Sequence, residues 1–333
     1  MKISKQNVFT GTQCFIAVLI FIMWNTITSV ECAVSGYELQ AVEAIKRVKK
    51  SVVGVSVRYS ESSEIRCGTG LIISENGYII TTAHLIPGAE RIQVNVSDKE
   101  ELTASLIGAE CHSGIAVVKI ERGDLPVPVW ENSGRLRTDE IFFALGHPLK
   151  FGFTVRSFCG IRPGHEAIAT GKYNWDRSSG DTVINRKGEV VGLFVVSDRK
   201  KPDLSQPVSC ELFVPIDKAL KISKFLIDNR TKADFEPLTG ISAISVTKEM
   251  SDLCNTPIKY GVLVNNVAKD GCCARAGIYP GNIISEVNDT KISSMKDFEA
   301  VLRDQPLRQD MKFTVWHGLR KKEIAVKGEN SDK

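Results

Sequence analysis

The sequence predicts a mainly β protein that ends in a smaller α+β unit. Short segments of alternating apolar and polar residues, separated by Gly, Pro and Asn turns, run through most of the chain. This pattern is typical of a β-barrel or a β-sandwich. A polar stretch at 229–236 then precedes about a hundred residues, which is enough for a separate small domain.

The composition of the chain narrows the classes of function that we expect. The chain has 333 residues, 25% of them charged and 43% hydrophobic, as in soluble globular proteins. The formal net charge is only +4, and no block of Lys and Arg with interleaved aromatic residues occurs, so nucleic acid is not an expected partner. None of the nine cysteines has the spacing of a zinc site, so we expect neither a metal nor a cofactor.

Residues 1–32 have the pattern of a signal peptide or signal anchor. Lys2 and Lys5 precede an apolar run at 14–24, which is shorter than the roughly 20 residues of a membrane-spanning helix. We therefore expect a protein of the secretory pathway, or one anchored to a membrane on its lumenal or extracellular side. An organelle, mitochondrion or chloroplast, is the alternative, although no Arg precedes Arg47.

The first large unit contains one helix and then a series of strands. Apolar residues recur every three positions over 37–50, which predicts a helix. Strands are predicted at 51–57, 71–73, 78–80, 92–96, 102–107, 115–120 and 141–145, with a strand-turn-strand unit at 182–193. A helix is predicted over 218–228. In the second unit we expect strands at 261–264, 283–287 and 312–316, and a helix at 295–302 capped by Ser293 or Ser294.

Several motifs follow one another in a familiar order between 42 and 327. They are Gly68-Thr69-Gly70-Leu71-Ile72-Ile73, Thr82-Ala83-His84, Ala144-Leu145-Gly146-His147-Pro148-Leu149, Thr154-Val155, Ile168-Ala169-Thr170 and Gly188-Glu189-Val190-Val191-Gly192. As a collinear set they resemble the HtrA/Deg (protease Do-like) serine proteases. The resemblance implies a trypsin-like double β-barrel at 51–229 behind a helical segment at 33–50, then a linker at 230–236, a small α+β PDZ domain at 237–328 and a tail at 329–333.

The C-terminal unit carries its own part of the resemblance. Ala274-Arg275-Ala276-Gly277-Ile278-Tyr279-Pro280-Gly281-Asn282-Ile283-Ile284 is similar to a PDZ segment of the family. The loop Leu238-Thr239-Gly240-Ile241 would then bind a peptide C-terminus through its backbone N–H groups, with the peptide added as a strand beside 241–244. The alternative is a PDZ fold whose groove is plugged or self-bound.

The resemblance also assigns the chemistry and shows what is missing. Ser179 would be the nucleophile and His84 the base that takes its proton. The acid of the triad would stand at Gly114, which has no side chain, and Glu110 or His112 from the same turn are the nearest replacements. Without the acid, nothing fixes the imidazole tautomer or stabilises its cation.

The loop before the serine is altered as well. Arg177 stands where the family has a glycine whose N–H joins that of Ser179 in the oxyanion hole. Asp181 replaces a second glycine, and its charge would oppose an oxyanion if it faced the site. Gly171 replaces an acid beside the substrate pocket.

Two functions follow from these residues. The first is an HtrA/Deg homologue with impaired or lost proteolysis, a pseudoprotease of protein quality control that binds unfolded proteins or peptide C-termini. The second is an active, ATP-independent serine endopeptidase that degrades misfolded proteins. In both cases the resemblance implies a homo-oligomer, a trimer in this family, with a possible N-terminal membrane anchor.

Overall fold

The computed structural model describes residues 36–59, 62–97, 100–137, 139–147, 152–159, 180–197, 210–230, 239–269, 271–303 and 310–328. The chain divides into two compact units, Met1–Val42 and Glu43–Lys333, and all three sheets lie in the second. The predicted leader at 1–32 lies outside the described residues.

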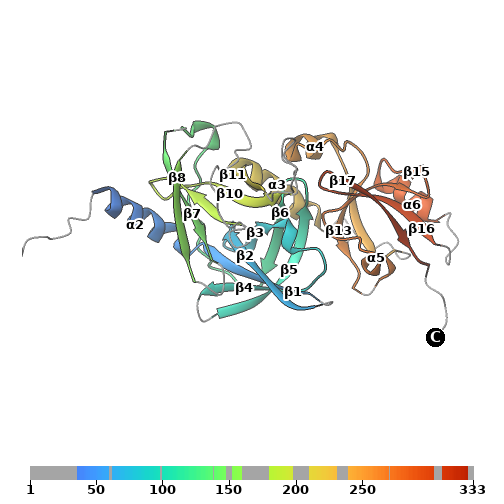
Figure 1. Ribbon diagram of the computed structural model, residues 1–333, viewed down its shortest axis with the longest axis horizontal. Coiled ribbons are helices and arrows are strands. Elements are labelled where there is room, and N and C mark those ends of the chain that lie inside the picture. The colour runs from blue at the N-terminus through green and yellow to red at the C-terminus, as the bar shows by residue number, and fades with distance from the viewer. Residues whose placement is uncertain are drawn as a thin grey trace, which may run out of the picture. The chain divides into compact units, whose positions relative to one another are not determined.

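The first sheet is a closed barrel of six antiparallel strands in the order β1-β2-β3-β6-β5-β4. Its strands are β1 (Val52–Tyr59), β2 (Ser62–Ile72), β3 (Tyr78–Thr82), β4 (Ala89–Ser97), β5 (Glu100–Glu110) and β6 (Ile115–Ile120). Figure 1 shows them in blue to green. The predicted strands at 71–73 and 78–80 pair as a hairpin, in which Leu71 lies opposite Ile80 and Ile72 opposite Ile79. Alternate apolar side chains of these strands fill the barrel, and burial of this one face fixes the register.

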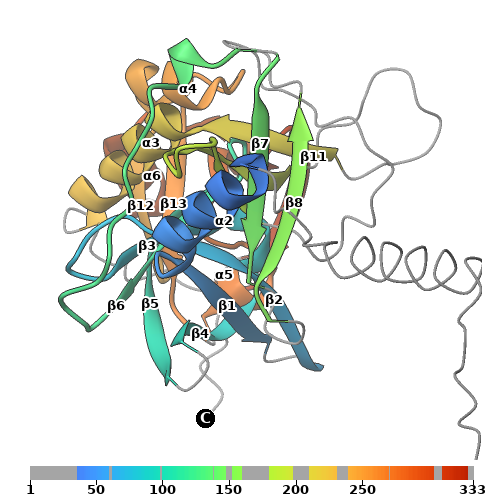
Figure 2. The same cartoon turned by 90° about the vertical axis from the view of Figure 1, so that its left-hand side faces the viewer.

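The second sheet has the strand order β11-β10-β9-β7-β8. The strands are β7 (Ile141–Gly146), β8 (Thr154–Cys159), β9 (Thr182–Ile184), β10 (Val190–Ser197) and β11 (Cys210–Pro215). Figure 2 shows β7 and β8 side by side. Four aromatic rings form a chain through its core, with neighbouring centroids 5.3–6.0 Å apart: Phe142, Phe158, Phe194 and Phe213. Such tilted and edge contacts are the favoured arrangement of aromatic rings.

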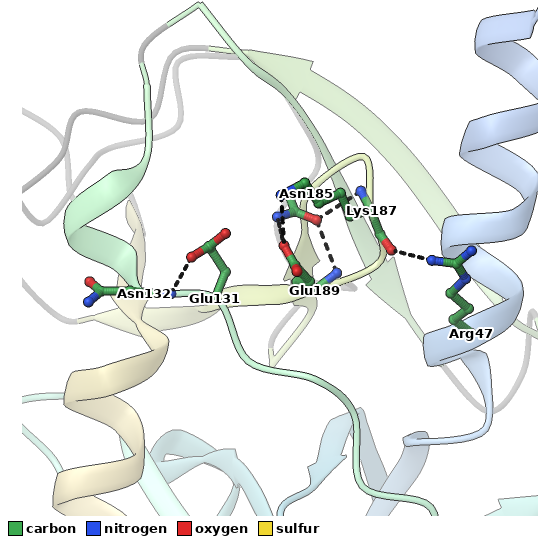
Figure 3. Close-up of polar contacts among 6 residues, drawn as sticks. All are labelled: Arg47, Glu131, Asn132, Asn185, Lys187 and Glu189. Carbon is green, nitrogen blue, oxygen red and sulfur yellow. Dashed lines mark hydrogen bonds and ion pairs between the residues drawn. The ribbon is translucent and has the colours of Figure 1, made fainter.

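Helix α2 (Gly36–Lys49) confirms the predicted N-terminal helix. Near its C-terminal end Ala44 and Val48 are buried. Arg47 donates a hydrogen bond from Nη1 to the carbonyl of Lys187, in the turn between β9 and β10 (Figure 3). Asn185 holds this turn closed, since its side-chain oxygen accepts from the N–H groups of Lys187 and Glu189. The turn that follows β9 is thereby fixed to a helix far away in the sequence.

Helix α3 (Ile216–Asp228) is the other predicted helix of this region and is confirmed. Its apolar face is buried through Ile216, Ala219, Ile222 and Leu226. Two short 3₁₀ helices, η1 (Ala83–Leu85) and η2 (Ser133–Arg135), complete the part of the chain before the linker that the structure describes.

The described residues of the C-terminal domain, from Thr239 onward, form a six-stranded sheet with three helices. Its main path is β12-β13-β14-β16-β17, and β15 pairs with β14. The elements are β12 (Ile241–Ser245), α4 (Lys248–Cys254), β13 (Val262–Val267), α5 (Cys272–Arg275), β14 (Ile283–Val287), β15 (Thr290–Lys291), α6 (Met295–Arg303), β16 (Met311–His317) and β17 (Arg320–Val326). Ser294 caps α6 by accepting from the N–H of Asp297, as predicted. Helix α4, which the sequence pattern did not reveal, begins at a comparable cap, Thr247.

Candidate functional site

His84 lies on η1, directly after strand β3, where the sequence predicts the catalytic base. Its Nδ1 is 2.7 Å from the hydroxyl oxygen of Thr82, a fully buried residue at the end of β3. In a serine-protease triad this nitrogen donates to a carboxylate. Here a neutral hydroxyl takes that place. Sequence reasoning missed Thr82, although its position two residues before His84 within the histidine turn was a usable signal.

The hydroxyl of Thr82 lacks two properties that the carboxylate of a triad provides. A carboxylate only accepts hydrogen bonds, so it forces the proton onto Nδ1 and leaves Nε2 free to act as a base. The Thr82 hydroxyl can donate or accept, so it permits either tautomer of His84. It also carries no charge to stabilise the imidazolium that forms when His84 takes a proton.

Gly114, at the position of the acid, has a backbone fitted to glycine. Its φ is +74°, in the left-handed region that side chains rarely adopt. Its carbonyl accepts a hydrogen bond of 2.8 Å from the N–H of Ala83, which holds the turn against the histidine turn. The missing side chain is therefore accompanied by a backbone conformation that disfavours any replacement.

Glu110 is held within its own turn. Its two carboxylate oxygens accept from the backbone N–H groups of His112, at 2.9 Å, and Ser113, at 2.6 Å. All three residues are buried. The carboxylate is thus committed to shaping the turn that ends at Gly114, which argues against Glu110 as a replacement acid.

Asp181 is buried, with 1% of its surface exposed, and its carboxylate is paired. One oxygen is 2.6 Å from Nη2 of Arg156 on β8, and the other accepts a 3.1 Å hydrogen bond from the Thr69 hydroxyl on β2. The N–H of His147 in turn donates to the Thr69 oxygen. Because Arg156 compensates the charge, Asp181 opposes an oxyanion less than the sequence suggested.

Burial dominates the ionisation of Asp181. It raises the pKa of this carboxyl to about 6, against the opposing effects of the Arg156 charge and of the hydrogen bonds from Arg156 and Thr69. Because this pKa is about 6, mild acid protonates the Asp181 carboxyl.

A pH dependence of stability follows. Between about pH 4 and 6, Asp181 binds more protons in the folded than in the unfolded chain, whose value is near 3.8. The free energy of unfolding should therefore fall as pH rises through this window, by at most about 3 kcal/mol from this group. Denaturant unfolding at pH 4.5 and 7.5 measures it, with Asp181→Asn as the reference variant. Equal pH dependence in both proteins would contradict the assignment.

The other predicted residues of the first domain lie outside the described residues. These are Ser179, Arg177 and Gly171. The described chain resumes at Gly180, whose N–H donates a 2.8 Å hydrogen bond to the carbonyl of Phe194 on β10. The residue after the predicted nucleophile is thus bound to the second sheet.

The predicted carboxylate-binding loop of the C-terminal unit is described from Thr239 onward, and Leu238 lies outside the described residues. Thr239 is buried, and its hydroxyl oxygen accepts a hydrogen bond of 3.3 Å from the N–H of Ile241. Gly240 has a φ of +64°, and its carbonyl accepts from the N–H of Ala268 at 2.7 Å. The loop lies directly before β12, which is at one end of the strand order among the described strands.

No group of His, Cys, Asp and Glu side chains with the geometry of a metal site occurs among the described residues. A search of the same residues for a helix both long and apolar enough to cross a membrane finds none.

Comparisons with known proteins agree with the two-part architecture. Residues 68–193 match the trypsin-like peptidase domain family, and residues 237–327 match the PDZ domain family. A probable periplasmic serine endoprotease DegP-like from Hahella chejuensis is 32% identical over 233 residues, which cover 68% of this chain and 49% of that protein. The putative serine protease HhoB of Synechocystis is 27% identical over 281 residues, covering 78% and 65%.

The β-barrel with its histidine turn, followed by a PDZ domain, defines a protein that joins a trypsin-like peptidase domain to a PDZ domain. The chain belongs to the HtrA/Deg family. It spans about half the length of the first DegP-like relatives that it matches. Among solved structures, the serine endoprotease from Yersinia pestis is 23% identical with a TM-score of 0.47, covering 86% of this chain and 96% of that one.

Proposed function

We propose that this chain is an HtrA/Deg homologue of the secretory route that binds unfolded polypeptide and has lost most of its proteolytic activity. The observation that carries the proposal is the 2.7 Å contact between Nδ1 of His84 and the Thr82 hydroxyl, where the family has a carboxylate. A serine hydroxyl needs a base whose tautomer is fixed and whose cation is stabilised. The Thr82 hydroxyl positions the imidazole of His84, but it neither fixes the tautomer of the ring nor stabilises its cation.

The glycine backbone at 114 supports the same conclusion. A lone loss of the acid side chain would leave a site that one substitution repairs. Here the φ of +74° and the hydrogen bond from Ala83 to the Gly114 carbonyl fit the turn to glycine. Arg177 and Ser179, which form the proposed oxyanion loop, remain assigned by resemblance only.

Labelling by a serine-directed fluorophosphonate tests the proposal, because the reagent reports activation of the serine without any need for a substrate. We expect the wild type to be labelled no faster than Ser179→Ala at pH 7.5. Slow phosphonylation of surface serines by the reagent, with loss of fluoride, sets the background, and His84→Ala measures it a second time. Labelling that is complete within minutes and absent from both variants would refute the loss of activity.

The second candidate is the active endopeptidase, and two observations favour it. His84 has a partner on Nδ1, and the charge of Asp181 is compensated by Arg156. If this candidate is correct, Thr82→Val should slow labelling at least tenfold, because valine keeps the shape of threonine without its hydroxyl. Under our proposal the same substitution leaves labelling at background.

A further inference from the structure

We infer that a basic surface of the first domain binds the anionic headgroups of a phospholipid membrane. The surface is formed by the end of α2 with the residue that follows it (43–50) and by the turn between β9 and β10 (185–189). Its six cations are exposed side chains of these two segments: Lys46, Arg47, Lys49, Lys50, Arg186 and Lys187. Membrane contact goes beyond the proposed function and rests on one part of it, the secretory route, which brings the chain to a membrane.

Packing fixes the helix end and the turn to each other. The Nη1 group of Arg47 donates a 3.1 Å hydrogen bond to the carbonyl of Lys187, 140 positions away (Figure 3). Gly188, with a φ of +80°, lies so close to the helix that a Cβ there would be 2.8 Å from the carbonyl oxygen of Ala44. Ala44 itself is buried. Cations that are far apart in the sequence are therefore held on one surface.

Few carboxylates offset these charges. The helix end has one acid, Glu43, and the turn has one, Glu189. The Oε2 atom of Glu189 is 4.0 Å from Nζ of Lys187, which is the limit of an ion pair. Within the part of the chain that the structure describes, neither Lys46 nor Lys50 forms an ion pair. Six cations against two carboxylates leave an excess of positive charge, which attracts anions.

The chemistry of the cations favours a phospholipid surface. Four of the six are lysines, whose ammonium groups are hydrated point charges on flexible stems. Such groups reach separate headgroups on a plane, whereas a single carboxylate is bound best by the fork of an arginine. Neither segment contains an aromatic residue that could stack on a nucleic-acid base. Each lysine or arginine close to an anionic membrane raises the affinity about fivefold.

The position of the basic surface in the sequence also fits a membrane. Helix α2 begins at Gly36, shortly after the predicted leader at 1–32, which lies outside the described residues. The apolar run of that leader, at 14–24, is short for a membrane-spanning helix. A weak apolar signal holds a protein to a membrane reversibly, and a polybasic patch is a second signal that makes the attachment stable. The basic surface stays with the chain whether or not the leader is cleaved.

Vesicle flotation of the full chain tests the inference. Vesicles of phosphatidylcholine alone are compared with vesicles that contain about 30% phosphatidylglycerol, an anionic lipid, in about 0.1 M salt. The apolar leader enters both kinds of vesicle, so the ratio of the two partition coefficients reports the charged surface. We expect a ratio of at least about a hundredfold for the wild type, and a fall of about a hundredfold in Lys46→Gln/Lys49→Gln/Lys50→Gln, because three cations are removed. In about 1 M salt, where the Debye length is about 3 Å, the wild type should lose its preference.

Three lysines of the C-terminal domain provide a control with the same change of net charge. Lys296, Lys322 and Lys327 are exposed and lie outside the basic surface. The variant Lys296→Gln/Lys322→Gln/Lys327→Gln should keep the partition ratio within about threefold of the wild type, because the attraction falls off within a Debye length of the membrane. Denaturant unfolding with the same midpoint in all three proteins shows that these exposed substitutions leave the fold intact.

The partition ratios separate the outcomes. Equal partitioning of the wild type into both kinds of vesicle overturns the inference, and it is also the result expected if the surface binds a protein. A preference that survives in the variant of the basic surface, or that falls equally in the control variant, overturns it as well. A preference lost only in the variant of the basic surface supports the inference. Fluorophosphonate labelling uses none of these lysines, so the proposed loss of proteolysis is tested separately.

Discussion

Casein turnover by the wild-type chain is expected to lie about 10⁴-fold or more below that of an HtrA/Deg protease with an intact triad. This is the loss that follows when a triad acid becomes a neutral group. Here Nδ1 of His84 contacts the neutral Thr82 hydroxyl. Ser179→Ala should then change the measured rate little. Effects within a catalytic unit are not additive, so we add no separate factor for the altered oxyanion loop.

Restoring the acid alone should fail. In Gly114→Asp the new side chain starts from a φ of +74°, and the Thr82 hydroxyl already occupies Nδ1 of His84. We expect turnover within threefold of the wild type, together with a loss of stability of about 1 kcal/mol from the left-handed backbone. Turnover of fluorescent casein, with cooperative unfolding of each variant as the control, measures both. A rise of a hundredfold on this one substitution would show that the turn still has the geometry of the triad.

Arg156→Ala is expected to have the largest effect on stability, about 3–5 kcal/mol at pH 7.5. The substitution removes the cation 2.6 Å from the Asp181 carboxylate, which is buried and cannot regain water. The loss should be much smaller at pH 4.5, where Asp181 is protonated and needs no cation. Adding Asp181→Asn to Arg156→Ala should recover much of the stability at pH 7.5.

The chain offers a surface pair as a control for this experiment. Arg137 makes two hydrogen bonds to the Asp139 carboxylate, but both side chains are largely exposed. Arg137→Ala should leave denaturant unfolding unchanged, because solvent screens such pairs. If Arg156→Ala is equally silent at pH 7.5, then the pair of Arg156 and Asp181 does not stabilise the fold.

Two features of the candidate site could be predicted from the sequence. Position 114 is a glycine within a short motif, so the absence of the acid is visible in the linear order of residues. The loop at 238–241 is recognisable for the same reason, because it directly precedes a predicted strand. The contact between Thr239 and Ile241 spans two residues, yet nothing in the pattern says whether that hydroxyl faces the loop or the solvent.

The sequence by itself determined the order of barrel and PDZ domain and most of their strands and helices, and it placed a glycine where the resemblance expects the triad acid. These depend on local periodicity and on motifs of a few residues, which the chain carries in linear order. Only the tertiary structure decided that Nδ1 of His84 contacts the Thr82 hydroxyl and that Arg156 compensates the charge of Asp181. Asp181 contacts Arg156, which is 25 positions away in the sequence, and Thr69, which is 112 positions away. Folding brings such residues together through strand pairing, and burial then sets the energy of their charges.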